Sequence, residues 1–365
     1  MVTGESKLWV GIKDLPTEVQ LEMSNTTNII TITQIPNNQY GYRVQLLDTD
    51  GSPLKDVVIK GIDDPSTEIR TNSEGIVQFY SSKSSFSGLT YSGFPSHLDA
   101  SMFPKTMQGY INDTSVVIVN PDTSGYYGYD ITVTNNSGSI LANHPVYSIS
   151  GKNATVIGTT DSTGHLIMYR AMSSLTLAAK DGTHYIKSSV SGTIGSLKAN
   201  SLKTDIALCT GTLAVGNTIT CMGKSWIVCH RDGNKYYLAL SEIASMTRFG
   251  NENNNTYAGS TLASVAKQYE SGLNSDIIAL YAIDTTVENV TSKVFAASYD
   301  QMDGEFSYFN SDSRRICKYD GSNQWYWTSS PDSGGGVWGV DVDGSLDYSG
   351  PSTSGAFRPF VCLSL

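Results

Sequence analysis

The sequence has no long apolar segment. No stretch approaches the ~18 consecutive apolar residues that a membrane-spanning helix needs. The first residues also lack the basic stretch and the apolar run of a secretion signal. We therefore expect no membrane insertion and no export by such a signal.

Positive charge is in short supply. Lys and Arg number 24 against 34 Asp and Glu, which gives a formal net charge of -10. Proteins that bind nucleic acid or anionic lipid neutralise phosphates with Lys and Arg. The composition therefore excludes nucleic acid as a partner and argues against docking onto a lipid surface.

Cysteine is scarce. The five cysteines are odd in number and show no Cys-x-x-Cys spacing: Cys209, Cys221, Cys229, Cys317 and Cys362. Disulfide frameworks and metal sites usually show cysteines in even numbers at short spacings. We predict buried, reduced thiols at these positions, no metal and no cofactor, and folding in a cytoplasm.

Catalytic signatures are also missing. The chain has no GxSxG, P-loop, HExxH or Rossmann glycine pattern. Cys317 and Cys362 are the nearest candidates for a reactive pair, but neither lies in a catalytic cysteine motif. We therefore expect no enzyme and no catalytic residue.

What is abundant is Gly, Ser, Thr, Asn and Tyr, while charged residues make up only 16% of the chain. Such a composition is typical of β-rich, turn-rich architecture. The length of 365 residues allows two to four domains. We predict a mainly β protein with an α+β domain at the C-terminus.

The first 36 residues read as a separate piece. Leu8–Ile12 and Ile29–Ile32 predict two short strands, too few for a core of their own. We expect residues 1–36 to attach the chain to a larger assembly or to copies of itself. Lys7–Lys13 also resembles a segment that opens many phage tail-tip and fibre proteins.

An internal repeat follows. GYRVQL at 41–46 aligns with GYDITV at 128–133, and TNSEG at 71–75 aligns with TDSTG at 160–164. Alternating strands separated by Asp/Asn-Gly turns are typical of a small β-sandwich. The repeat predicts two such modules, at 37–121 and 122–208. They resemble immunoglobulin-like modules of bacterial surface and phage proteins, which usually act as spacers.

The pattern changes from Cys209 onward. A hairpin is predicted, with strands at Ser225–Cys229 and Lys235–Leu240. Ser260–Tyr269 has the cap and the apolar spacing of a helix, and Ser275–Tyr281 predicts a second, short one. Val294–Ser298 then predicts an apolar strand.

The last forty residues combine two aromatic segments with a polar middle. Trp325–Pro331 and Gly355–Leu363 carry large rings that are expected to be buried. Asp332–Ser354 between them has too few apolar side chains for a core. The sequence therefore predicts a buried aromatic support that displays a polar surface.

Four ordered motifs in this region carry a resemblance: GKSWIV at 223–228, KVFAAS at 293–298, YWTSSP at 326–331 and GAFRPF at 355–360. Residues 209–365 are similar to the C-type-lectin-fold variable proteins of diversity-generating retroelements, which include phage tropism determinants. In that family a reverse transcriptase rewrites adenines in the codons of a surface patch, while the fold beneath stays constant.

The resemblance implies two sets of residues. Tryptophan cannot arise from such rewriting, whereas small residues and tyrosine can. The predicted scaffold is Trp325, Trp327, Trp338, Phe357 and Arg358. The predicted ligand-binding patch is Tyr326, Ser329, Asp332, Ser333, Gly334, Gly335, Gly336, Asp347, Tyr348, Ser349, Ser352, Thr353 and Ser354. The alternative is an ordinary Gly/Ser loop.

Two features of this region have their own interpretation. Trp338–Leu346 predicts a strand, a tight Asp-Gly turn and a second strand. Calcium at Asp341, Asp343 and Asp347 is the alternative, but EF-hand spacing is missing. Arg358 is predicted to be buried and structural, with loop carbonyls accepting its hydrogen bonds.

The resemblance implies a receptor-binding protein of a phage or prophage tail, located on the virion. Its partners would be a bacterial cell-surface receptor, protein or glycan, and other virion tail proteins. A homotrimer is expected, because multivalency raises avidity. The alternatives are a structural tail or fibre protein and a host-encoded adhesin on the bacterial cell surface.

Overall fold

The computed structural model describes residues 18–23, 26–31, 39–62, 68–95, 97–110 and 116–365. Nearly half of these residues lie in strands and far fewer in helices, so the predicted mainly β fold is confirmed. The strand predicted at Leu8–Ile12 and the tail-protein resemblance at Lys7–Lys13 lie outside the described residues. The strand predicted at Ile29–Ile32 corresponds to the end of β2 (Thr26–Thr31).

The chain divides into two compact units. Unit 1 comprises Met1–Tyr129, Ile167–Ser173 and Gly192–Lys198. Unit 2 comprises Asp130–Leu166, Ser174–Ser191 and Ala199–Leu365. The strands β11 (Tyr127–Asn135), β14 (His165–Arg170) and β18 (Leu197–Thr204) each pass from one unit to the other. The module boundaries given above stay predictions.

Unit 1 is built from short strands around one core. Its other elements are β1 (Glu18–Met23), β2, β3 (Tyr40–Leu46), β4 (Val58–Lys60), β5 (Ile69–Arg70), β6 (Ile76–Ser81), β7 (Ser85–Ser87), β8 (Thr90–Ser92), η1 (Ala100–Met102), β9 (Thr106–Gln108), β10 (Val117–Val119) and β17 (Thr193–Ile194). Strand β3 pairs with β6 antiparallel and with β10 parallel. Its alternate residues Tyr42, Val44 and Leu46 are buried, as a half-buried strand requires.

Unit 2 contains a five-stranded antiparallel sheet in the order β13-β12-β15-β16-β19. The strands are β12 (Pro145–Ser150), β13 (Asn153–Thr159), β15 (Ser174–Asp181), β16 (His184–Ser191) and β19 (Ile206–Ala207). Strand β15 pairs with β16 along its whole length, from Ser174↔Ser191 to Asp181↔His184.

The C-terminal part of unit 2, residues 209–365, is organised by a six-stranded sheet in the order β20-β21-β22-β23-β34-β27. The strands are β20 (Cys209–Thr210), β21 (Thr218–Cys221), β22 (Lys224–Asp232), β23 (Lys235–Leu240), β27 (Val294–Phe295) and β34 (Phe360–Ser364). The predicted hairpin is confirmed as β22 and β23. Of the strand predicted at Val294–Ser298, only the first two residues are strand, although Ala296 and Ala297 are buried.

Helices and smaller sheets complete this part. They are β24 (Ser245–Arg248), α1 (Thr261–Ser271), α2 (Ser275–Leu280), β25 (Thr285–Val287), β26 (Val290–Ser292), η2 (Gln301–Glu305), α3 (Asp312–Arg315), β28 (Lys318–Tyr319), β29 (Ser322–Asn323), β30 (Tyr326–Pro331), β31 (Val337–Val340), β32 (Leu346–Ser349) and β33 (Ser354–Phe357). The predicted helices are confirmed as α1 and α2. The Ser260 hydroxyl caps α1 by accepting a hydrogen bond from the Ala263 amide at 3.0 Å.

The cysteine prediction is wrong for two of the five residues. Cys209 and Cys221 lie directly opposite each other on β20 and β21 and form a disulfide. Cys229, Cys317 and Cys362 are free and buried, as predicted. Burial raises the pKa of all three free thiols, and to about 11 for Cys362. These thiols therefore stay protonated and weakly nucleophilic at neutral pH.

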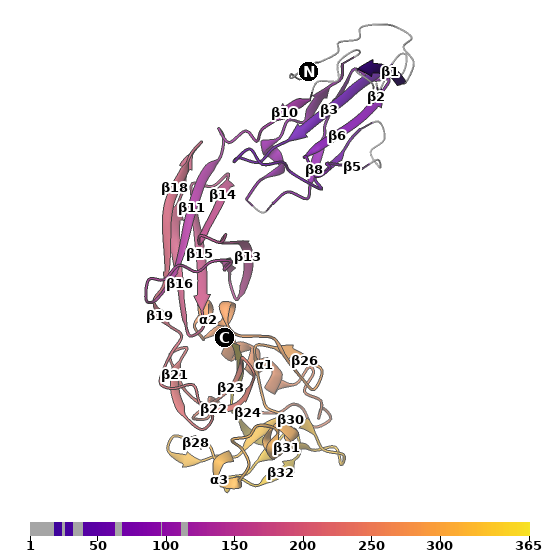
Figure 1. Cartoon of the computed structure of the whole chain (residues 1–365). Coiled ribbons are helices and arrows are strands. Elements are labelled where there is room, and N and C mark those ends of the chain that lie inside the picture. Colours follow the sequence, from indigo (N-terminus) through magenta and orange to yellow (C-terminus); the bar gives the residue numbers. More distant parts are fainter. Residues whose placement is uncertain (1–17, 24–25, 32–38, 63–67, 96, 111–115) are drawn as a thin grey trace. The chain divides into compact units, whose positions relative to one another are not determined.

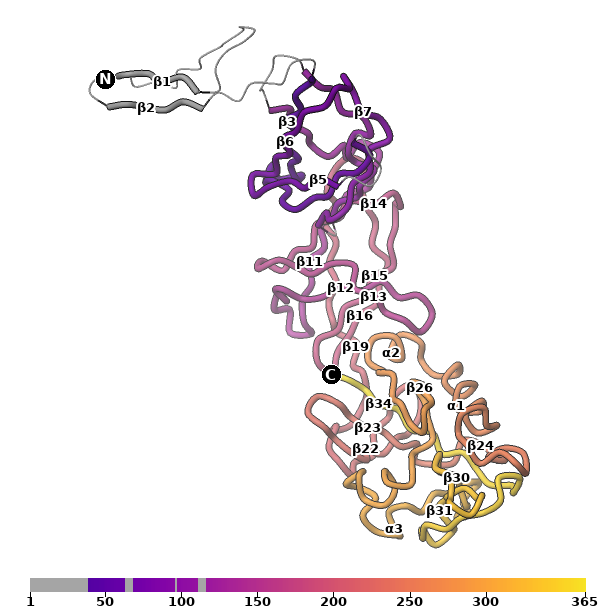
Figure 2. The backbone as a smooth tube through the Cα atoms, turned by 90° about the vertical axis from the view of Figure 1, so that its right-hand side faces the viewer, coloured from indigo at the N-terminus to yellow at the C-terminus, as the bar shows by residue number. Residues whose placement is uncertain are grey.

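Direct contacts join the five-stranded sheet to the C-terminal part of unit 2. Lys187 Nζ lies 2.6 Å from Asp276 Oδ1 in α2. The Tyr281 hydroxyl donates to the His184 carbonyl at 2.7 Å. In Figures 1 and 2, α2 lies at this junction, whereas β30, β31 and β32 lie at the opposite end of unit 2. The sheet formed by β30, β31 and β32 is therefore held away from the junction.

Candidate binding surface

The two aromatic segments predicted from the sequence meet in the core. Trp327 and Phe357 are buried, as expected. Trp325 stands edge-on to Trp327, with ring centroids 4.2 Å apart. Gly355 has no room for a side chain, because a Cβ there would lie 2.2 Å from the Trp325 ring. We call Trp325, Trp327, Phe357 and Arg358 the frame.

Arg358 is fully buried and acts as predicted, with backbone carbonyls as hydrogen-bond acceptors. Its Nε donates to the Leu240 carbonyl at 2.9 Å and its Nη1 to the Arg315 carbonyl at 3.2 Å. Nη1 also donates to the Tyr326 hydroxyl at 3.0 Å. The guanidinium carbon lies 5.1 Å from the ring centroid of Phe309. Carbonyls and ring faces thus compensate the buried charge in place of a carboxylate.

The prediction that Tyr326 and Ser329 belong to an exposed patch is wrong. Tyr326 is 1% exposed and Ser329 0%. Both lie on β30, whose residues from Tyr326 to Ser330 are all buried. Burial raises the pKa of Tyr326 to about 12. The neutral phenol donates to the Arg315 carbonyl at 2.7 Å and accepts from Arg358, so it supports the frame.

The predicted hairpin after β30 is confirmed as β31 and β32, with Trp338 opposite Tyr348. Gly344 closes its turn with φ of 91°, and a Cβ there would lie 1.9 Å from the Asp312 carbonyl oxygen. Only glycine fits that position without strain. The buried Arg315 fixes α3 below the turn, bonding Asp312 Oδ1 at 2.6 Å and the Met302 carbonyl at 2.7 Å.

The remaining predicted patch residues lie at or near the surface of β32 and of the loops beside it. Ser333, Gly334, Gly335, Asp347, Tyr348, Thr353 and Ser354 are exposed, while Asp332, Gly336, Ser349 and Ser352 are half-buried. Tyr348 is 57% exposed. We call Ser333, Asp347, Tyr348, Thr353 and Ser354 the exposed patch.

Several of the half-buried residues serve the backbone. The Asp332 carboxylate accepts from the Gly334 amide at 2.8 Å, and Gly335 has φ of 92°. A Cβ on Gly336 would lie 3.0 Å from the Ser349 carbonyl oxygen. Asp332, Gly335 and Gly336 are thus needed for the shape of this turn and are less free to change than the residues of the exposed patch.

Trp338, predicted as scaffold, is half-buried and lies between two rings. Its ring centroid is 4.5 Å from that of Tyr299 and 5.6 Å from that of Tyr348. Tyr299 is a surface aromatic that we did not predict, because it comes to this place from a distant part of the chain. The backbone amide of Tyr299 donates to Ser330 Oγ at 3.0 Å, which fixes its position.

The three aspartates considered for calcium serve their own turns instead. Asp341, Asp343 and Asp347 each accept a hydrogen bond from a backbone amide one or two residues ahead. Hydrogen bonds from Ser345 lower the pKa of Asp343. Among the described residues no three His, Cys, Asp or Glu side chains are grouped closely enough to hold a metal ion.

No protein-family model matches the chain, and no curated protein does. Solved structures with a distant likeness to the chain include the following three. The Bacillus anthracis TIE protein is 15% identical, with 49% of this chain and 36% of that chain covered and a TM-score of 0.19. A streptococcal ancillary pilin is 8% identical, with 52% of this chain and 76% of that chain covered and a TM-score of 0.20. The shaft pilin SpaA from Lactobacillus rhamnosus GG is 9% identical, with 48% of this chain and 100% of that chain covered and a TM-score of 0.24.

TM-scores this low do not establish that these structures share their fold or their role with this chain. A separate finding concerns membranes: in the part of the chain that the structure describes, no helix has the length and apolar character to span a bilayer. The function has to be argued from the exposed patch and the frame.

Proposed function

We propose that this chain is a receptor-binding protein of a phage or prophage tail. In this proposal residues 209–365 form a C-type lectin fold of the retroelement-diversified kind, and immunoglobulin-like modules carry it away from the attachment segment. The exposed patch binds a protein or glycan on a bacterial cell, without catalysis. Other tail proteins hold the N-terminal segment, and the chain assembles as a homotrimer.

One observation carries the proposal. Small polar residues and one tyrosine face solvent, while the tryptophans and the arginine next to them in sequence are packed or hydrogen-bonded beneath. Tyrosine gives a rigid contact area, and Ser, Thr and Asp give adaptable hydrogen bonds, as in antibody binding sites. The position of β30–β32 at the far end of unit 2 from the α2 junction suits display to a partner (Figure 1).

The test is binding of the full-length protein to a panel of bacterial cells, with Tyr348→Ala as the variant. We expect Tyr348→Ala to weaken binding at least about tenfold, because central tyrosines often dominate interfaces. The matched control is Tyr110→Ala in unit 1, where the tyrosine is 42% exposed. Equal binding by Tyr348→Ala and wild type would contradict the proposal. Burial of Tyr348 against another tail protein would favour the structural alternative.

The diversification has a separate test in the genome. A reverse-transcriptase gene near the coding sequence, with a near-copy of the stretch that encodes residues 325–360, is the expected arrangement. The two copies should differ at adenines in codons of the exposed patch and agree in codons of the frame. Differences spread evenly over both sets would contradict a retroelement.

A host-encoded surface adhesin is the second candidate, and the disulfide between Cys209 and Cys221 favours it. Disulfides persist mainly in oxidising surroundings such as a cell surface. Immunoblots of purified phage particles and of washed, intact cells distinguish the two. Detection on particles supports the tail protein, whereas detection only on cells supports the adhesin.

A further inference from the structure

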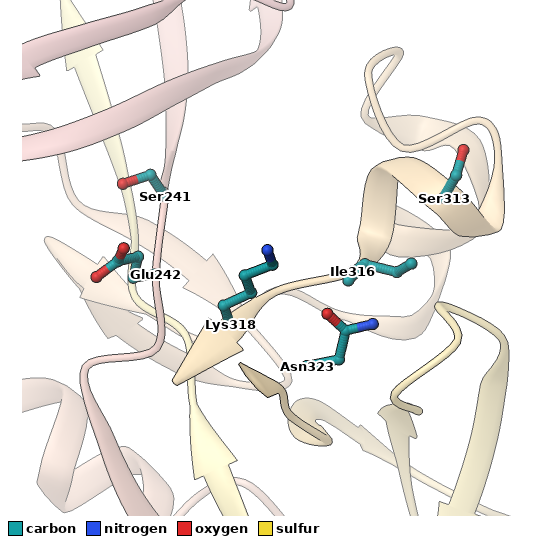
Figure 3. A pocket seen from close by; sticks show the side chains of 6 residues that line it. All are labelled: Ser241, Glu242, Ser313, Ile316, Lys318 and Asn323. Atoms are coloured by element: carbon teal, nitrogen blue, oxygen red, sulfur yellow. The ribbon is translucent and has the colours of Figure 1, made fainter. Parts of the chain in front are cut away.

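A hollow lies beside the turn of the β31–β32 hairpin, outside the exposed patch. Its volume is 460 Å³, and it is lined by Ser241, Glu242, Ser313, Ile316, Lys318 and Asn323 (Figure 3). This volume is within the range of small-molecule sites. None of these residues belongs to the exposed patch, and their side chains determine which ligand the hollow can bind.

The β28–β29 hairpin builds one wall. Asp320 and Gly321 have φ of 49° and 83°, the positive values of a two-residue hairpin turn. Lys318 lies directly opposite Asn323, so both side chains project from the same face. Asn323 Nδ2 donates to the Val342 carbonyl at 3.0 Å, which ties this wall to the β31–β32 turn.

The other walls come from the segment after β23 and from α3. The Ile243 amide donates to the Lys318 carbonyl at 2.9 Å, which places Glu242 beside β28. The Cys317 thiol donates to the Ser241 carbonyl at 3.6 Å. Ser313 lies on α3, which the hydrogen bond from Arg315 Nε to the Met302 carbonyl at 2.7 Å holds in place. The hollow therefore rests on fixed backbone.

The charges in the hollow are opposite and unpaired. Within the ranges that the structure covers, neither Glu242 nor Lys318 takes part in an ion pair. In Figure 3 the Lys318 side chain lies between Glu242 on the left and Ile316 and Asn323 on the right. A neutral sugar would leave both charges facing water. A ligand with an ammonium and a carboxylate would pair with both.

We propose that this hollow binds a zwitterionic group, with a free ammonium at Glu242 and a free carboxylate at Lys318, on the receptor that the exposed patch contacts. The inference rests on the proposed function for its place in recognition. The binding chemistry itself can be measured without any receptor.

The experiment titrates the full-length protein with alanyl-alanine by saturation-transfer NMR. Three analogues are titrated in parallel: N-acetylated, C-amidated, and blocked at both ends. The free dipeptide is expected to bind, and the doubly blocked one at least about fivefold more weakly. Glu242→Gln should weaken the free dipeptide about threefold, in the range of exposed ion pairs, and leave the N-acetylated one unchanged. Lys318→Met should likewise weaken binding of the free dipeptide about threefold and leave binding of the C-amidated dipeptide unchanged.

The matched controls are Glu252→Gln and Lys267→Met, two exposed charged residues outside the hollow. Equal binding of blocked and free dipeptides, or no binding of either, would overturn the proposal. Cell binding separates this inference from the proposed function. If Glu242→Gln and Lys318→Met bind cells like wild type while Tyr348→Ala does not, the hollow has no role in recognition and the exposed patch does. If Tyr348→Ala binds like wild type, the proposed function fails.

Discussion

The frame and the exposed patch are neighbours in the chain but differ in how their side chains are held. Arg358 donates three hydrogen bonds inside the core, and a Cβ on Gly355 would collide with the Trp325 ring. Ser333 and Tyr348 point to solvent. A substitution in the frame therefore disturbs several partners at once, whereas one in the exposed patch disturbs few. In the function proposed above, this difference would let the exposed patch vary in sequence while the fold stays the same.

The largest effect is expected for Arg358→Met. The change removes the Arg358 donors to the Leu240 carbonyl and the Tyr326 hydroxyl and leaves the Arg315 carbonyl with Tyr326 as its donor; a buried polar group left without its partner costs about 1–3 kcal/mol. We expect the free energy of unfolding to fall by roughly 3 kcal/mol or more. Urea unfolding followed by tryptophan fluorescence measures it, since four of the five tryptophans lie in residues 209–365. Arg314→Met, at an exposed arginine on α3, should change it by less than about 1 kcal/mol. Equal losses of unfolding free energy in Arg358→Met and Arg314→Met would show that the frame is no more sensitive to substitution than the surface.

Gly355→Ala should have a smaller effect. The added methyl meets the Trp325 and Trp327 rings at 2.2 and 2.6 Å, and overpacking of this kind typically costs about 1–3 kcal/mol. The control is Gly350→Ala on the exposed loop, where the nearest atom would be 3.8 Å away. The same urea titration should show a change within about 0.5 kcal/mol for the control. A tolerant Gly355 would mean that the tryptophans are loosely packed.

Alkaline pH should reveal the buried phenol of Tyr326. Burial raises its pKa to about 12 from the ordinary value of 10.0, so the folded protein holds this proton at a higher pH than the unfolded chain does. The stabilisation is therefore complete below pH 10 and is lost as pH rises towards 12. The loss is roughly 2 kcal/mol. Urea unfolding between these pH values should show a shallower decline for Tyr326→Phe than for wild type. Parallel curves would place Tyr326 in a solvated site.

Tyr348→Ala should have the smallest effect on stability. Its ring contacts Trp338 at the surface, and exposed substitutions usually change the free energy of unfolding by less than about 0.5 kcal/mol. The urea midpoint should match wild type even where cell binding is lost. A loss as large as that of Gly355→Ala would assign Tyr348 to the frame.

Much of the C-terminal part could be predicted because large aromatic side chains are stable mainly when they are buried in a core. Trp327 and Phe357 had to be buried, and the Asp-Gly turn fixed the β31–β32 hairpin. Tyr326 and Ser329 were misplaced because β30 is buried on both faces, and no alternation along a strand reveals that. Extending the predicted hairpin from Leu346 to Tyr348 would have paired Trp338 with Tyr348.

Other features depend on pairings that a linear pattern does not contain. The disulfide arises because β20 and β21 place Cys209 opposite Cys221, a register set by the fold of both strands. Tyr299 reaches Trp338 through a hydrogen bond to Ser330, far away in sequence. The Asp320-Gly321 turn, by contrast, is a local signal that predicts β28 and β29, and with them the wall of the hollow.

The central claim is tested most directly by replacing four of the five residues of the exposed patch together. The variant carries Ser333→Ala, Tyr348→Ala, Thr353→Ala and Ser354→Ala together, and the measurement is its free energy of unfolding in urea. We expect a total change below about 1 kcal/mol, because each replaced side chain faces solvent. A loss of roughly 3 kcal/mol, as expected for Arg358→Met alone, would show that these side chains belong to the fold and would contradict the account.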